Sequence, residues 1–152
     1  MSFDTHAGTR GARQPPGPLL RWVNKAAARR IRRTGKMSGL DAVVLTTVGR
    51  KSGLERSNPV GWFPAGDGSG LIVASAAGTA RNPAWYHNIA AHPDQVKIEL
   101  SGRTIPVTAE QVHGAERAEA WRQITAAAPR FAGYQGKTDR EMPVIRLTPR
   151  SG

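Results

Sequence analysis

Short segments rich in β-branched and apolar residues recur along the chain, and tight turns join most of them. Alternating apolar and polar residues at 96–100 are typical of a half-exposed strand, and Ser101-Gly102 turns it into the next one. Six segments have the length and residue types of strands, namely 42–48, 58–63, 71–76, 96–100, 104–112 and 144–148. Strands joined in this way favour an antiparallel, barrel-like sheet over alternating βαβ units.

Two or three helices are expected beside these strands. Residues 1–18 are rich in Gly and Pro and predict a flexible tail. Residues 19–36 predict a basic amphipathic helix, and 40–150 form the barrel domain. Pro83 to about Ala91 and Glu116 to Ala128 read as further helices. The apolar stripe expected on the first helix contains Leu20, Val23, Ala27 and Ile31.

Positive charge is concentrated near the N-terminus. The chain has 152 residues and a formal net charge of +11, and residues 1–40 hold nine Lys and Arg against one Asp. Such a segment can bind nucleic acid, anionic lipid or an anionic ligand, and composition does not choose among them. The segment lacks a nucleic-acid fold signature and lies apart in sequence from the motifs described below. We therefore expect no nucleic-acid partner.

Several chemistries are excluded by residue types and spacing. The chain has no cysteine, so disulfides and thiolate chemistry are absent and a cytoplasmic location is expected. The four histidines show no metal-ligand spacing, and no Gly-x-Ser-x-Gly elbow occurs. No apolar run reaches the ~18 residues of a membrane-spanning helix. The sequence predicts neither a metal site nor a hydrolase.

Three segments can carry chemistry. The first, Gly49–Gly53 with Arg56, presents cationic and hydroxyl groups on a tight turn, and is either an anion site or a solvated basic turn. The second, 82–88, places Trp85 in the core, whereas Tyr86 and Asn88 can meet a ligand. The third, 131–140, is read as a Gly-rich loop whose two aromatic residues can wall a pocket, followed by a structural Asp139–Arg140 pair.

Taken together and in order, these segments resemble the deazaflavin-dependent nitroreductase family, whose members are also described as quinone reductases using reduced coenzyme F-420. The resemblance rests on three stretches, LTTVGRKSG at 45–53, VASAAGTARNPAWYHNIAAHP at 73–93 and GYQGKTDREMPVIRL at 133–147. It implies an α+β protein built on an antiparallel split β-barrel of the FMN-binding type, with about six strands. Coenzyme F420 is the implied cofactor, and FMN is the alternative.

The resemblance also implies roles for individual residues. Phe131 and Tyr134 would border the substrate pocket. The catalytic candidates are Tyr134, which with solvent is the expected proton donor after hydride transfer, and Ser75, a candidate hydrogen-bonding group. The coenzyme would be bound by Arg50, Lys51, Ser52, Arg56, Asn58, Pro59, Ser75, Trp85, Tyr86 and Asn88. One departure stands out, because the family usually has a lysine and two glycines where this chain has Ala76, Ala77 and Gly78. The missing lysine removes one charge partner for an acidic coenzyme tail.

The expected activity is hydride transfer from reduced coenzyme F420 to an electron-poor acceptor, either a quinone, a nitroaromatic, or a conjugated enone or lactone. Two alternatives remain at this point, namely an FMN-binding split-barrel oxidoreductase and a non-enzymatic basic module that binds membrane or nucleic acid. Residues 19–36 also allow a peripheral contact with an anionic membrane, so a membrane-associated location is a second expectation.

Overall fold

The computed structural model of the chain describes residues 3–12, 17–37 and 40–150. Its centre is an eight-stranded antiparallel sheet in the order β1-β2-β6-β7-β8-β5-β4, with β3 paired to β2 outside this path. The strands are β1 (Lys36–Met37), β2 (Leu40–Val48), β3 (Glu55–Gly61), β4 (Phe63–Pro64), β5 (Gly70–Val73), β6 (Val96–Leu100), β7 (Arg103–Gln111) and β8 (Val144–Pro149).

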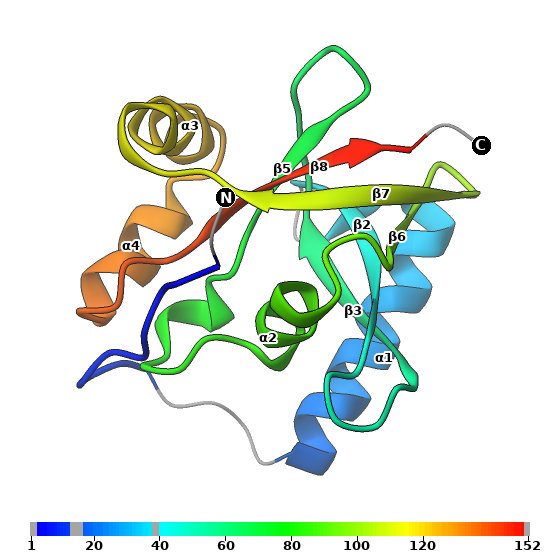
Figure 1. The fold of residues 1–152 in the computed structure, drawn as a ribbon, viewed down its shortest axis with the longest axis horizontal. Helices are drawn as coiled ribbons and strands as arrows, with labels where there is room; N and C mark the ends of the chain where they lie inside the picture. The colour runs from blue at the N-terminus through cyan, green and yellow to red at the C-terminus, as the bar shows by residue number, and fades with distance from the viewer. Residues whose placement is uncertain (1–2, 13–16, 38–39, 151–152) are drawn as a thin grey trace.

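Helices lie around the rim of this curled sheet. Figure 1 shows α3 (Gly114–Ala127) and α4 (Arg130–Lys137) at one side, α1 (Gly17–Thr34) at the other, and α2 (Ala84–Ala91) between them. A short 3-10 helix, η1 (Ala76–Gly78), precedes α2 and packs against α4. Helices therefore flank the sheet on both sides.

The interior follows from the alternation along the strands. Successive side chains of a strand point to opposite faces, so Ile98 and Val96 of β6 are buried while Lys97 between them is half-exposed. The main core fills the curled sheet and includes Leu45, Ile72, Ile98, Val107, Ile145 and Leu147, each at most 1% exposed. A second cluster lies under α3 and α4, around Ile124 and Met142. The predicted antiparallel sheet is confirmed.

Two details differ from the sequence-based expectation. The described residues form eight strands rather than about six, because β1 and β4 are two-residue pairings that carry no sequence signal. The segment read as a Gly-rich loop after 130 is the helix α4. Gly133 and Gly136 lie on its open side, where an added Cβ would meet nothing within 4 Å. Each glycine costs about 1 kcal/mol of helix stability, which burial of Phe131 at 7% exposure offsets.

The first helix buries only part of the expected stripe, since Ile31 is buried as expected and Ala28 joins it in place of Val23. Ala28 and Ile31 pack against β2, whereas Val23 is 43% exposed and Ala27 is only half-buried. The side chain of Leu20, also placed on the expected stripe, lies outside the described residues. Within the described part of the chain, no helix combines the length and apolar character that crossing a membrane requires.

Residues 3–12 run as an extended segment along the body of the protein, although the sequence predicted a flexible tail for 1–18. The amide of Gly8 donates to the carbonyl of Ala80 at 2.7 Å, and that of Ala12 donates to Gly78 at 2.9 Å. Phe3 packs edge-on against Tyr86 with ring centroids 6.0 Å apart. Backbone hydrogen bonds of this kind depend on the tertiary fold, so Gly- and Pro-rich composition does not reveal them. Residues 1–2 and 13–16 of the predicted tail lie outside the described ranges.

Candidate functional site, a pocket lined by basic residues

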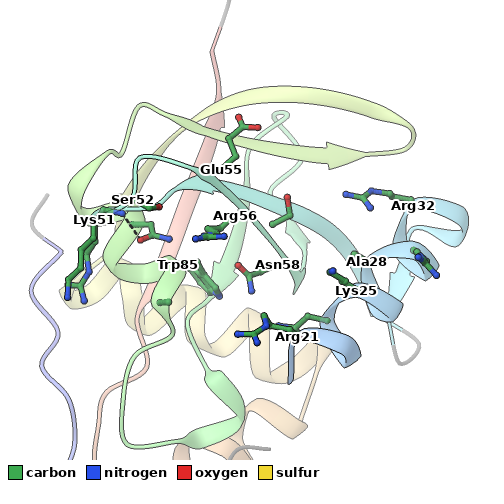
Figure 2. Close-up of a pocket in the computed structure, with 17 residues that line it drawn as sticks. Arg21, Lys25, Ala28, Arg32, Lys51, Ser52, Glu55, Arg56, Asn58 and Trp85 are labelled. Carbon is green, nitrogen blue, oxygen red and sulfur yellow. Dashed lines mark hydrogen bonds between the residues drawn. The ribbon is translucent and has the colours of Figure 1, made fainter. Parts of the chain in front are cut away.

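A cavity of about 830 Å³ lies between α1, the turn after β2, the start of β3 and the first turn of α2. Figure 2 shows Arg21 and Lys25 projecting from α1 toward the side that carries Asn58 and Trp85. Its lining residues are Arg21, Asn24, Lys25, Ala28, Arg29, Arg32, Gly49, Arg50, Lys51, Ser52, Glu55, Arg56, Ser57, Asn58, Ala84, Trp85 and Asn88. We call this cavity the basic pocket.

The turn after β2 is held in shape by its own backbone. Gly49 donates to the carbonyl of Leu54 at 2.8 Å, and Gly53 donates to Gly49 at 2.9 Å. Gly53 has a φ of 71°, which residues with a Cβ rarely adopt. The Ser52 hydroxyl accepts a hydrogen bond from the Leu54 amide at 3.2 Å. This hydrogen-bonded turn fixes the backbone positions of Arg50, Lys51 and Ser52, and so the directions in which their side chains project.

Asn88 attaches this turn to α2. Its Oδ1 accepts a hydrogen bond from the backbone amide of Arg50 at 3.1 Å, and its Nδ2 donates to Thr47 Oγ1 at 3.3 Å. Asn88 is 7% exposed, so both ends of the amide are held in a partly water-excluded place. The sequence predicted that Asn88 lines the coenzyme site. It does line the basic pocket, and it also fixes the position of the basic turn.

Helix α1 supplies a wall of the pocket that the sequence analysis missed. Arg21, Lys25 and Arg29 are four residues apart, so all three lie on one face of the helix, and all three line the cavity. The basic N-terminal segment and the motifs are distant along the chain, so their proximity in the fold is not visible in the sequence. The i, i+4, i+8 spacing of three cations was the available signal.

The pocket is strongly positive. Seven of its lining residues are basic and one, Glu55, is acidic; the basic ones are Arg21, Lys25, Arg29, Arg32, Arg50, Lys51 and Arg56. Glu55 pairs with Lys97 at 2.6 Å, and Arg32 forms hydrogen bonds to both carboxylate oxygens of Glu99. Burial, and then the positive charge of Arg50, lower the pKa of His87 from its ordinary value. An anion with several charges is the ligand that such a cavity favours.

The structure brings together most of the residues predicted to bind the coenzyme. Those that line the basic pocket are Arg50, Lys51, Ser52, Arg56, Asn58, Trp85 and Asn88. Pro59, Ser75 and Tyr86 are not among its lining residues. Pro59 pairs with Val44 inside the sheet. Tyr86 is 2% exposed, and its hydroxyl donates to Gln111 Oε1 at 2.6 Å, so the phenol faces the core rather than the pocket.

The residues predicted for the acceptor side form a second group and are not among the residues that line the basic pocket. Phe131 and Tyr134 pack edge-on with centroids 5.5 Å apart, and Phe63 packs on Phe131 at 5.7 Å. Gly78 of η1 touches this group so closely that an added Cβ would lie 2.6 Å from the Tyr134 carbonyl oxygen. Ser75 immediately precedes η1. The two predicted catalytic residues therefore come from adjoining segments.

Arg140 holds the segment 74–82, which contains Ser75 and η1. Its guanidinium donates to the carbonyls of Ala74 (2.8 Å), Ser75 (2.8 Å) and Thr79 (3.1 and 3.2 Å) and to Asn82 Oδ1 (2.7 Å). Burial lowers its pKa from the ordinary value, yet arginine stays charged at neutral pH. The sequence predicted a capping ion pair between Asp139 and Arg140, and the structure gives each of the two side chains other partners. Both residues are structural, but Arg140 points inward while Asp139 binds Thr9 and the amide of Arg10.

The curled antiparallel sheet defines a split-barrel protein, and a basic pocket adjoins the sheet. The chain belongs to the F420H2-dependent quinone reductase family, whose model matches residues 21–149. The F420H2-dependent quinone reductase Rv1261c of Mycobacterium tuberculosis is 38% identical over 112 residues, which cover 72% of this chain and 74% of that protein. A solved F420H2-dependent reductase, FDR-A, is 36% identical with a TM-score of 0.63, covering 70% of this chain and 92% of the other.

These comparisons confirm the family resemblance and the α+β split-barrel fold. They also confirm an F420-dependent oxidoreductase and coenzyme F420 as the cofactor, and they do not favour the FMN alternative. The family description names a quinone as the acceptor, whereas nitroaromatic reduction has only loose support. Within the described ranges, no group of three or more His, Asp or Glu could hold a metal ion.

Proposed function

We propose that this protein holds reduced coenzyme F420 in the basic pocket and reduces a quinone that approaches from the side of Tyr134. The observation that carries the proposal is the gathering of seven basic side chains around one cavity of about 830 Å³. A cavity of this size suits a large cofactor, and its charge suits a polyanion. When bound, the reduced coenzyme supplies the hydride. The residues of the chain would bind and orient the coenzyme and the quinone, and would supply a proton to the reduced quinone.

The basic turn would bind the anionic part of the coenzyme. Arg50 and Arg56 offer planar guanidinium groups that can bind phosphate through two hydrogen bonds, and Lys51 adds a compact charge. Ser52 adds a hydroxyl beside them. Trp85, at the start of α2, gives the same cavity an apolar wall that suits a flat ring. Asn58 also lines this cavity, whereas Pro59 and Tyr86 keep their assignment to the coenzyme only as neighbours of these groups.

The acceptor would lie against Phe131 and Tyr134. Reducing a quinone requires a proton after the hydride, and the Tyr134 hydroxyl or solvent would donate it. Ser75 is the candidate hydrogen-bonding group on the segment that precedes η1.

The segment after Ser75 departs from the family pattern of one lysine followed by two glycines. In this chain Ala76 takes the place of the lysine, and Ala77 and Gly78 take the places of the glycines. Ala76 and Ala77 have φ values of 44° and 54°, a left-handed turn that costs about 1–2 kcal/mol per residue with a Cβ. Nitroaromatics, enones and lactones are further candidate acceptors.

Titration of the protein with coenzyme F420, followed by the coenzyme's fluorescence, tests the proposal. Lys51→Ala and Arg56→Ala should each weaken binding by ~1.5–3 kcal/mol, because each loses a charge-assisted hydrogen bond. The weakening should shrink at high salt. Arg103→Ala, an exposed residue that does not line the pocket, is the control and should bind normally. Unchanged affinity in both pocket variants would contradict the proposal.

A peripheral contact with an anionic membrane is the second part of the proposal. Leu19 (49%), Trp22 (68%) and Val23 (43%) are exposed apolar side chains close together on α1. Exposed Arg30 and Arg33 lie further along the same helix. An apolar group flanked by arginines suits the interface of an anionic membrane, and lipid-soluble quinones dissolve in the apolar interior of such a membrane.

A further inference from the structure

The basic pocket has two walls that differ in their geometry. The turn wall, formed by Arg50 and Lys51, gathers charge at one point next to α2. The helix wall spreads charge along a line, because an α-helix rises 1.5 Å per residue. Arg21, Lys25 and Arg29 therefore span roughly 12 Å of α1 in two steps of about 6 Å. A single compact anion at the turn cannot reach all three.

The helix wall carries no compensating negative charge. Among the described residues, Arg21, Lys25 and Arg29 form no ion pair, and the first turn of α1 contains no acidic residue. Arg32, the next cation along the same face, is instead neutralised by Glu99 at 2.9 Å. The uncompensated stretch therefore begins near the start of α1 and ends before Arg32. Three like charges on one helix face repel one another, which an anion laid along them would relieve.

We infer that Arg21, Lys25 and Arg29 form a subsite for the acidic tail of the coenzyme, separate from the phosphate site at the basic turn. This inference rests on the proposed function. A tail that carries several carboxylates along a flexible chain matches a line of cations, whereas a cofactor with one phosphate uses only the turn wall. The helix wall therefore selects a coenzyme with a long acidic tail over a singly phosphorylated flavin.

The competing explanation is a general one, in which the charge of α1 attracts any anion without contacting the tail. A matched pair of variants separates the two. Arg21→Gln/Lys25→Gln removes two charges that line the pocket, and Arg30→Gln/Arg33→Gln removes two exposed charges of the same helix that do not. The two variants have the same chain length and the same net charge as each other, because each loses two positive charges. The long-range electric field of the protein therefore changes by a similar amount in both. Circular dichroism and thermal unfolding check that both fold.

The measurement is the Kd of each full-length protein at ~0.15 M salt for coenzyme F420 with a long acidic tail and for the coenzyme with its tail removed. For the pocket pair, the long-tailed Kd should rise roughly three- to thirtyfold, as expected for the loss of two exposed ion pairs. The Kd of the pocket pair for the tail-free coenzyme should change less than about twofold. In the Arg30/Arg33 pair, the Kd values for the long-tailed and for the tail-free coenzyme should both change less than about twofold. Lys51→Ala should weaken both forms.

Three results would overturn the inference. Equal weakening by both pairs would show a general field rather than a subsite, and an unchanged long-tailed Kd in the pocket pair would place the tail elsewhere. If the Arg21/Lys25 variant bound the tail-free and the long-tailed coenzyme with equally weakened affinity, the helix wall would bind the phosphate rather than the tail. Failure of the unaltered protein to bind either form would instead overturn the proposed function, so the two failures are distinguishable.

Discussion

Adjacent residues of α2 face different surroundings because one helical turn points its side chains in several directions. Trp85 lines the basic pocket, Tyr86 enters the core, and Asn88 holds the basic turn. The Tyr86 hydroxyl is occupied by Gln111 and by the amide of Thr5. At the residue scale, the direction of each side chain decides its role, and a polar group that already has protein partners is a poor candidate for binding a ligand.

The buried guanidinium of Arg140 donates five hydrogen bonds, and their contribution to stability can be tested. Arg140→Lys should lower the free energy of unfolding by about 3 kcal/mol, because an ammonium cannot reproduce the guanidinium fork and leaves buried carbonyls without a donor. Chemical denaturation measures the change. Arg103→Lys, at an exposed position of β7, is the control and should shift stability by less than about 0.5 kcal/mol. Equal stability of the two variants would show that the five hydrogen bonds contribute little.

Tyr134 gives a second prediction. Tyr134→Phe keeps the ring that packs on Phe131 and removes only the hydroxyl. The Kd for the coenzyme should stay unchanged, while kcat for a quinone should fall about tenfold or more, since solvent replaces a positioned proton donor only in part. Steady-state kinetics across several acceptors and the pH profile of kcat check this. Normal turnover with every acceptor would leave Tyr134 a packing residue.

The sequence revealed the basic turn more completely than the other site residues. Two glycines around Arg50 and Lys51 are a local signal, because a tight turn depends on nearby residues alone. The inward direction of Tyr86 and the carbonyl cage around Arg140 depend on segments far away in the chain. No local pattern carries that information. Such residues become visible only when the tertiary structure is known.

At the scale of elements, α1 presents three distinct faces. Ala28 and Ile31 pack on β2, Arg21 and Lys25 line the basic pocket, and Trp22 with its apolar neighbours faces outward. Periodicity predicted that this segment is an amphipathic helix, and the structure confirms the helix from Gly17 to Thr34. It predicted the burial of Ile31 but not of Ala28, because a helix rich in both apolar and basic residues offers more than one possible stripe.

The outward face gives a third prediction. The full-length protein should sediment with anionic vesicles and not with neutral ones, at roughly 1 kcal/mol per basic residue near the surface. Leu19→Ser/Trp22→Ser should remove this binding by taking away the apolar group that inserts. Leu54→Ser is the matched control, since Leu54 is 60% exposed but lies outside α1. Binding that is equal in both variants, or absent at low salt, would exclude α1 as a membrane contact.

Strands and helices differ in how well the sequence located them. The hairpin of β6 and β7 was expected at 96–100 and 104–112 and is found at Val96–Leu100 and Arg103–Gln111. Alternation and a two-residue turn define it locally. Helix α4 was missed because Gly133 and Gly136 lower its intrinsic helix propensity. Its packing against η1 and α3, which is tertiary, compensates for that.

At the scale of the whole molecule, the N-terminal segment 3–12 joins parts that lie far apart in the chain. Thr5 bonds Asn82 and Gln111, and Thr9 and Arg10 bond Asp139. The hydrogen bonds from the Thr9 side chain, then those from the Arg10 and Thr9 amides, lower the pKa of Asp139 to about 2. Because the folded pKa is lowered, this contact is complete above pH ~4 and is lost as the pH falls toward 2.

The close approach of Gly11 to the body gives the last prediction. An added Cβ at Gly11 would collide with the backbone of Thr79 and Ala80, so Gly11→Ala should displace the segment. Hydrogen exchange of the Gly8 and Ala12 amides, which bond Ala80 and Gly78, should then speed up by at least ~tenfold. Gly133→Ala, the same change where an added Cβ meets nothing, is the control. Coenzyme affinity should stay within about twofold, because residues 3–12 do not line the basic pocket. Amides already unprotected in the unaltered protein would support the flexible tail that composition predicts.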